Sequence, residues 1–345
     1  MALFKTFGEN PTGARLADIE KSQNYKNRMF QNLSVTRLMA GNSSLVKNLW
    51  KFMNKPSATI PPKPLPSVRT DLKSIQSKKP VIIWFGHSSY FIRINGKNVL
   101  VDPVFSGNAS PFSFGAKSFA GTDVYSADDF PDIDLLILTH DHYDHLDSKT
   151  VLKLKPKIKH IATSLGVGSH LLYWGFEKNN FTEFDWWDHK LVAGNIDITA
   201  VPARHFSGRS FVRNKTLWSS FILASGGHKI FIGGDSGYDV HFRLIGEKYG
   251  PFDIALLESG QYNEQWPDIH MMPENTVQAS RDLNASVLMP VHWGKFALGL
   301  HPWDEPVKRV IQKARDLHVR VVTPLIGEPV ILGETYPDQQ WWNTL

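Results

Sequence analysis

The sequence of 345 residues contains no cysteine. This absence excludes disulfide bonds, thiolate metal ligands, cysteine-held iron–sulfur clusters and a cysteine nucleophile. Any metal must therefore be bound mainly by His, Asp or Glu side chains. The chain also lacks a run of about 18 apolar residues, the length of a membrane-spanning helix, and its first ten residues hold no stretch typical of a signal peptide. We expect a cytoplasmic protein.

The charge balance is only mildly basic, with 38 Lys and Arg against 33 Asp and Glu. Such an excess suits a phosphate-bearing substrate or an anionic membrane surface but identifies neither. A nuclease would need a clustered basic groove, which the pattern does not indicate, so no nucleic-acid partner is predicted. The content of 42% hydrophobic and 21% charged residues is typical of a globular protein with a large core.

The chain divides into an N-terminal extension, residues 1–75, and a main body, residues 76–345. The extension lacks sustained strand patterning and ends in a proline-rich connector at 56–66. We expect it to pack on the body. Apolar residues around Trp50 predict a short amphipathic helix, which either docks on the core or contacts a membrane surface peripherally.

The body predicts strands interleaved with helices, an α/β or α+β arrangement. Residues 90–94 and 98–102 form a hairpin around Asn95-Gly96, and residues 219–224 and 229–235 form another around Gly226-Gly227. An apolar strand follows each hairpin, at 135–138 and 253–257. This repetition predicts two similar halves packed face to face, with the functional site where they meet. Helices are expected at 166–174, 274–283 and 305–317.

The segment 139–145, Thr-His-Asp-His-Tyr-Asp-His, carries the strongest chemical signal. It follows an apolar strand and contains three imidazoles and two carboxylates. In an extended chain His140 and His142 project to one side, while a following turn swings Asp144 and His145 around. The spacing therefore suits a centre with two metal ions.

This HxHxDH segment resembles the signature of the metallo-β-lactamase-fold hydrolases. The resemblance implies a four-layer αββα sandwich. The segments 84–89, 102–106 and 292–298 further resemble the branch of phospholipases D that hydrolyse N-acylphosphatidylethanolamine, including its bacterial members. The likeness to this branch covers residues 80–310, and residues 7–36 resemble the N-terminal extension of the bacterial members.

The resemblance also implies a ligand set. His140, His142 and His205 would bind one ion, and Asp144, His145 and His292 the other. Asp235 would bridge the two ions together with a hydroxide. Two Zn²⁺ ions are expected because the ligands are imidazoles and carboxylates, although iron or manganese fits the same ligands.

Further residues are expected to support the chemistry. Asp102 would hold the second ring nitrogen of a ligating histidine. His270 would contact phosphate or protonate the leaving group, and together with Asp144 and Asp235 it makes up the expected catalytic set. His87 either supports a ligand or is a buried core histidine. The segment between Pro103 and Phe130, with Phe105, Phe112, Phe114 and Phe119, is either a pocket wall or aromatic packing beneath a loop.

The resulting functional hypothesis is a dinuclear zinc phosphodiesterase of phospholipase D type, which hydrolyses N-acylphosphatidylethanolamine-like lipids through a metal-bridging hydroxide. A lactonase or another ester or amide hydrolase of the same fold is the alternative. A membrane-binding scaffold with structural metals is the alternative of another class. The substrate partner would be a phosphodiester or phospholipid, and a homodimer stays open.

Overall fold

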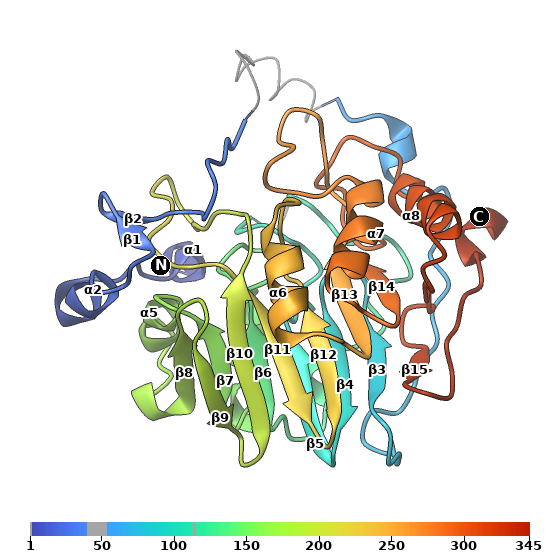
Figure 1. The fold of residues 1–345 in the computed structure, drawn as a ribbon. Coiled ribbons are helices and arrows are strands. Elements are labelled where there is room, and N and C mark those ends of the chain that lie inside the picture. The colour runs from blue at the N-terminus through green and yellow to red at the C-terminus, as the bar shows by residue number, and fades with distance from the viewer. Residues whose placement is uncertain (1, 40–53, 113–114) are drawn as a thin grey trace.

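Two β-sheets pack face to face and helices cover their outer faces in the computed structural model (Figure 1), which describes residues 2–39, 54–112 and 115–345. The helix expected around Trp50 lies outside the described residues. The first sheet has seven strands in the order β15-β3-β4-β5-β6-β7-β8. Its strands are β3 (Val81–Trp84), β4 (Tyr90–Ile94), β5 (Lys97–Val101), β6 (Leu135–Leu138), β7 (Ile161–Ser164), β8 (Phe181–Phe184) and β15 (Pro329–Ile331).

The second sheet has six strands in the order β14-β13-β12-β11-β10-β9. They are β9 (His189–Val192), β10 (Ile196–Pro202), β11 (Ser219–Ser225), β12 (His228–Ile232), β13 (Ile254–Glu258) and β14 (Leu288–Val291). The strands β3 to β7 and the strands β10 to β14 each run as two antiparallel pairings followed by two parallel pairings. The expected repetition of the two halves is therefore present in the topology.

Both hairpins form at the expected turns. Ile94 pairs with Lys97 across Asn95 and Gly96, whose φ angles are 49° and 73°. The second hairpin turns at Gly226 and Gly227, with φ angles of 58° and 81°. Two consecutive positive φ angles match the twist of the flanking strands, which is why Asn-Gly and Gly-Gly are favoured there.

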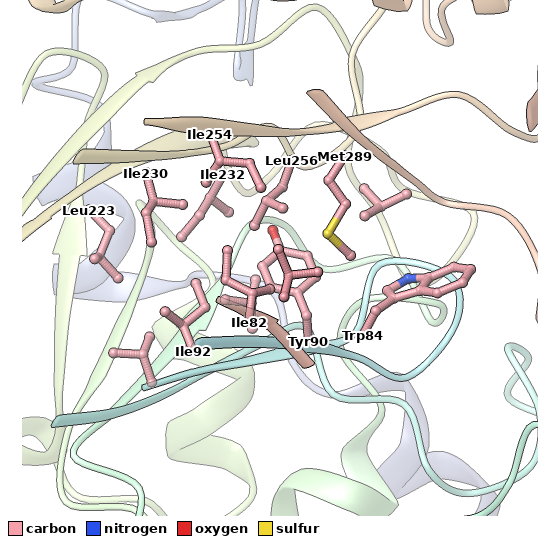
Figure 2. Close-up of a cluster of buried hydrophobic side chains, with 14 of the residues drawn as sticks. Ile82, Trp84, Tyr90, Ile92, Leu223, Ile230, Ile232, Ile254, Leu256 and Met289 are labelled. Carbon is pink, nitrogen blue, oxygen red and sulfur yellow. The ribbon is translucent and has the colours of Figure 1, made fainter. Parts of the chain in front are cut away.

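The main core lies between the sheets (Figure 2). Side chains of β3 and β4, such as Ile82 and Ile92, point toward side chains of β12 and β13, such as Ile232 and Leu256. All four are fully buried, and burial of each such side chain contributes about 1.5–3 kcal/mol to folding. The alternate residues of the same strands face outward against helices, because successive strand side chains point to opposite faces.

Helices complete the outer layers. Apolar residues of α4 (Ser148–Leu154) and α5 (Gly168–Tyr173) pack on the outer face of the first sheet. Those of α6 (His241–Tyr249), α7 (Pro273–Asp282) and α8 (Glu305–Asp316) pack on the second. The expected αββα sandwich is confirmed. Short 3-10 helices are η1 (Ser57–Thr59), η2 (Ala127–Asp129), η3 (Lys155–Lys157), η4 (Lys178–Asn180) and η5 (Trp341–Thr344).

The N-terminal extension includes α1 (Ala2–Phe7), α2 (Gly13–Ile19) and a two-stranded sheet of β1 (Tyr25–Lys26) and β2 (Met29–Phe30). It contacts the body through a buried apolar cluster, in which Ile19 and Phe30 pack with Trp218, and through polar groups. The Arg15 guanidinium donates to both carboxylate oxygens of Glu183 at 2.7 and 2.8 Å. The Trp174 indole donates to the carbonyl of Lys5 at 2.6 Å. The division of the chain at residue 75 stays a prediction.

Two of the phenylalanines between residues 103 and 130 pack into the cores. The Phe105 ring lies 5.4 Å from that of Phe85 and 5.3 Å from that of Phe130, between ring centroids. Phe119 is buried in the core between the sheets. For these two residues the structure supports aromatic packing and not a pocket wall. In the part of the chain that the structure describes, no helix has the length and apolar character needed to cross a bilayer.

Candidate metal centre

The residues expected to bind metal all follow the ends of strands. Residues 139–145 leave the end of β6, His205 follows β10, Asp235 follows β12, and His292 follows β14. Because the carboxyl ends of neighbouring parallel strands meet at one edge of a sheet, these side chains converge although they are distant in sequence. The structure brings all seven together in two groups that share Asp235.

The first group consists of His140, His142, His205 and Asp235, whose ligand atoms lie within 4.8 Å of one another. His142 Nδ1 lies 3.0 Å from His140 Nε2 and 3.2 Å from His205 Nε2. Burial lowers the pKa of all three imidazoles, and the neighbouring imidazoles reinforce the effect. Three neutral nitrogens thus converge on one point, an arrangement typical of a metal site.

A hydrogen bond to a backbone carbonyl fixes the tautomer of His205. Its Nδ1 lies 2.8 Å from the carbonyl oxygen of Ile269, which can only accept a hydrogen bond. Nδ1 therefore carries the proton, and the lone pair of Nε2 faces His142 and Asp235. Ligating histidines characteristically have their other nitrogen fixed in this way.

The second group consists of His87, Asp144, His145 and His292, also with ligand atoms within 4.8 Å of one another. His145 Nδ1 donates to Asp102 at 2.8 Å, which directs Nε2 into the site. Burial alone would lower the pKa of His145, but the carboxylates of Asp235 and Asp144 raise it well above the ordinary value. This position therefore attracts positive charge.

Two buried atoms of the expected ligands lack hydrogen bonds within the described residues. They are Nε2 of His145 and Oδ1 of Asp235, which lie 3.1 Å apart. Buried polar atoms are almost always hydrogen-bonded, so an exception calls for a bound ion or a reactive role. Nitrogen and carboxylate donors without a thiolate suit Zn²⁺, iron or manganese. The residues present thus fit a metal centre.

Asp235 lies between the two groups. Its Oδ2 is 3.8 Å from His140 Nε2 and 3.7 Å from His205 Nε2. Its Oδ1 is 3.1 Å from His145 Nε2 and 3.1 Å from His292 Nδ1. Burial opposes its ionisation, yet His145 and His292 hold the pKa of Asp235 well below its usual range. Each carboxylate oxygen therefore faces one group, as a bridging ligand requires.

Asp102 lies behind the site and accepts three hydrogen bonds. Its Oδ2 accepts from the Thr139 hydroxyl at 2.6 Å and from His145 Nδ1 at 2.8 Å, and its Oδ1 accepts from the Thr139 backbone N–H at 2.9 Å. Burial raises the pKa of Asp102 and these donors oppose the rise. The carboxylate thus contacts His145 Nδ1, and its support of a metal ligand, which the resemblance implied, stays a prediction.

His87, which the sequence left undecided, contacts an expected ligand. Its Nε2 lies 2.9 Å from Asp144 Oδ2. The neighbouring Ser88 hydroxyl lies 2.9 Å from His292 Nδ1. The loop after β3 thus supports two residues of the second group. The spacing of residues 84–89 carries no metal-binding pattern. The only sequence signal for these contacts was therefore the resemblance of this segment to the phospholipase D branch.

Glu258 was missed by sequence reasoning. It ends β13 and its Oε2 lies 2.8 Å from Nδ1 of His270, while its Oε1 accepts from the backbone N–H groups of Ser236 and Met271, both at 3.1 Å. Burial raises the pKa of Glu258 to about 7, and Glu258 raises the pKa of His270 to about 9 against the effect of burial. The sequence signal that could have identified Glu258 is its position as a carboxylate at the end of an apolar strand.

A pocket of about 400 Å³ opens onto both groups. Its wall is largely apolar and carries one arginine, Arg213, whose guanidinium lies 5.3 Å from the centroid of the Phe206 ring. His270 lines it beside the expected ligands. The lining residues are Leu38, Met39, His142, Asp144, His205, Phe206, Arg213, Asp235, Gln261, Trp266, Ile269, His270, His292 and Leu298.

Comparisons with known proteins agree with this architecture. The beta-lactamase superfamily domain matches residues 97–293. An uncharacterized protein of Mycobacterium tuberculosis is 38% identical over 329 residues, which are 94% of this chain and 88% of that protein. The N-acyl-phosphatidylethanolamine-hydrolyzing phospholipase D 1 of Caenorhabditis elegans is 31% identical over 264 residues, 71% of this chain and 74% of that protein.

A solved structure shares the fold. Igni18, a metallo hydrolase from the archaeon Ignicoccus hospitalis, superposes with a TM-score of 0.56 at 22% identity, over 73% of this chain and 97% of that one. This chain therefore shares its overall fold with that protein.

Proposed function

The chain belongs to the beta-lactamase superfamily of metal-dependent hydrolases, and on that basis we propose that it is a dinuclear zinc phosphodiesterase of phospholipase D type. The proposed substrates are N-acylphosphatidylethanolamine-like lipids. The C. elegans relative is named for that activity and shares 31% of its residues with this chain over the aligned region. The products would be an N-acylethanolamine and a phosphatidic acid.

The observation that carries the proposal is the pocket. Trp266, Ile269 and Leu298 form an apolar wall suited to a hydrocarbon chain, and the floor holds side chains of both ligand groups. Arg213 is the one arginine or lysine in this lining. An apolar wall with few polar groups at one end binds an amphiphile with an anionic group.

The proposed ligands come from the two groups. His140, His142 and His205 would hold one ion, Asp144, His145 and His292 the other, with Asp235 shared. Two bound divalent ions would supply water activated at neutral pH and neutralise charge on the phosphoryl oxygens. The chain's task at this point is to hold the ligand atoms in place. Asp102 and the Ile269 carbonyl do so by fixing the tautomers of His145 and His205.

The leaving alcohol needs a proton, and we assign its donation to His270. As water adds to phosphorus, the bond between phosphorus and the alcohol oxygen breaks, so the water loses one proton and the alkoxide gains one. Glu258 accepts from Nδ1 of His270 and leaves Nε2 as the group that can donate to the departing oxygen. The pKa of His270, raised to about 9, keeps this proton on the ring at neutral pH.

The test pairs metal analysis with turnover. We would measure metal content in the protein purified without added metal, and hydrolysis of a generic phosphodiester, of N-acylphosphatidylethanolamine and of a lactone. Wild type, Asp235→Ala and the control Asp134→Ala would be compared, because Asp134 lies at the opposite end of β6. We expect about two zinc ions per chain and diester turnover lost only in Asp235→Ala. Turnover of the lactone alone would refute the proposed substrate class, and a protein inactive with added zinc would refute the proposed reaction.

A further inference from the structure

Exposed apolar side chains gather beside the mouth of the pocket. Six of the fourteen large apolar side chains that are exposed among the described residues lie in two short segments, residues 25–39 and 206–215. Phe211 is fully exposed, and Val35 is 90% exposed. The others are Met29, Leu33, Met39 and Val212. Exposed apolar groups that cluster in this way mark an interaction site more often than scattered ones do.

The two segments form one surface, which we call the mouth surface. The Phe30 N–H donates to the Asn214 carbonyl at 2.9 Å. The Asn32 side-chain amide donates to the His205 carbonyl at 2.7 Å and accepts from the His205 N–H at 3.0 Å. In Figure 1 the blue chain after β2 and the yellow-green loop after β10 accordingly lie side by side. Met39 from one segment and Arg213 from the other both line the pocket.

The mouth surface carries charge of one sign. Neither segment contains an Asp or a Glu, whereas together they contain Lys26, Arg28, Arg37, Arg213 and Lys215, besides the buried Arg209. Arg37 is paired with Asp268. Lys26 and Arg28 are exposed, and within the described part of the chain neither forms an ion pair. Apolar tips interleaved with cations complement a surface that is anionic outside and apolar beneath.

The loop that carries Phe211 is anchored to the metal-binding segment. The buried Arg209 guanidinium donates to the carbonyls of Asp141, Leu146 and Thr6, each at 2.7 Å. The Gly208 N–H donates to the Asp141 carboxylate at 2.7 Å. These bonds fix the base of the loop, so the exposed ring is held outward at a defined place next to the pocket. A preorganised apolar tip loses little conformational entropy on binding.

We propose that the mouth surface docks on an anionic lipid bilayer. Phe211, with Val212 and Val35, enters the interface between headgroups and acyl chains, while Lys26 and Arg28 contact anionic headgroups. The pocket then opens directly onto the bilayer, and a lipid can enter it without passing through bulk water. This last step depends on the proposed lipid substrate, whereas the docking itself does not.

Co-sedimentation of the zinc-loaded full chain with vesicles tests the proposal. We expect binding to vesicles of phosphatidylcholine mixed with phosphatidylglycerol, and weaker binding to phosphatidylcholine alone. Phe211→Ser should lower the partition coefficient about tenfold, since it removes the largest apolar group of the surface. Lys26→Gln and Arg28→Gln should each lower it about fivefold on the anionic vesicles only, and added salt should reduce that difference. Leu191→Ser, which removes an exposed apolar side chain of β9, is the matched control and should bind as wild type does.

The outcomes separate docking from catalysis. Phe211 does not line the pocket, so Phe211→Ser should hydrolyse a water-soluble short-chain diester at the wild-type rate and lose rate only on vesicles. If the wild-type protein fails to bind anionic vesicles, the proposal that a bilayer is the partner is refuted. Residues around Trp50 offer an alternative membrane contact, so binding that is equal in wild type and Phe211→Ser overturns the mouth surface as the docking site. Absence of diester turnover with vesicle binding intact would instead refute the proposed function alone.

Discussion

Replacement of Asp102 by Asn is the sharpest test of how the candidate metal centre is supported. The carboxylate accepts three hydrogen bonds, from the Thr139 hydroxyl, the Thr139 N–H and His145 Nδ1. An amide of the same shape offers one oxygen and one NH₂ group. If the oxygen keeps the Thr139 N–H, the NH₂ group faces His145 Nδ1. That nitrogen must then lose its proton, and the proton moves to Nε2, where it blocks metal binding. If the amide is turned over, its NH₂ group meets the Thr139 N–H instead.

Either orientation has a cost that can be measured. A buried donor left without an acceptor costs about 1–3 kcal/mol, and loss of a residue that orients a metal ligand lowers metal affinity by about 10–100-fold. We therefore expect Asp102→Asn to bind zinc about 10–100-fold more weakly in competition with a chelator, with a circular dichroism spectrum like that of wild type. Asp134→Asn is the control, because Asp134 accepts hydrogen bonds at the other end of β6. Equal zinc affinity in Asp102→Asn and wild type would refute the role of Asp102.

Three further predictions follow from the same structure. Glu258→Gln should lower kcat about 100-fold with KM and zinc content unchanged, because it disturbs the orientation of His270 and leaves the proposed ligands in place; an equal loss of zinc would contradict this. Ile232→Ala should lower the free energy of unfolding by about 2–5 kcal/mol in a denaturant titration, since the fully buried side chain fills the space between the sheets; a loss below about 1 kcal/mol would mean that the sheets close the cavity. Removal of metal by a chelator should lower the melting temperature, since zinc at 1,000 times its Kd stabilises the native chain by about 4 kcal/mol; an unchanged melting curve would contradict metal binding at this centre.

Local patterns in the sequence predicted most of the sandwich. The Asn95-Gly96 and Gly226-Gly227 turns set the hairpins because their backbone angles are available to few other residues. The apolar run at 135–138 and the helix at 305–317 were found at nearly their observed bounds. Pairing between distant segments was not accessible in this way. β15 pairs with β3, although almost the whole body separates the two strands along the sequence. Nothing in the sequence of either short strand identifies the other as its partner.

In the candidate site, too, local patterns were predictable from the sequence and contacts between distant segments were not. The dense cluster at 139–145 is visible in the sequence because its members are neighbours along the chain. Glu258 is one carboxylate at the end of an apolar strand, and its role depends on His270, which only the folded chain brings to 2.8 Å. The contact of His87 with Asp144 likewise joins two loops that follow different strands. The ligand assignments and the division of the chain at residue 75 stay predictions until metal binding and truncation are measured.

The shared position of Asp235 has a consequence for how the chain assembles. His140, His142, Asp144 and His145 belong to the first half of the sandwich, whereas His205, Asp235 and His292 belong to the second. Neither half alone can offer a complete set of donors. Metal affinity would therefore depend on the docking of the two sheets, and by thermodynamic linkage the bound ions would in turn hold the sheets together. Bound metal would therefore report on the contact between the two halves. A substitution that loosens the core between the sheets would lower metal content before it lowers secondary-structure content.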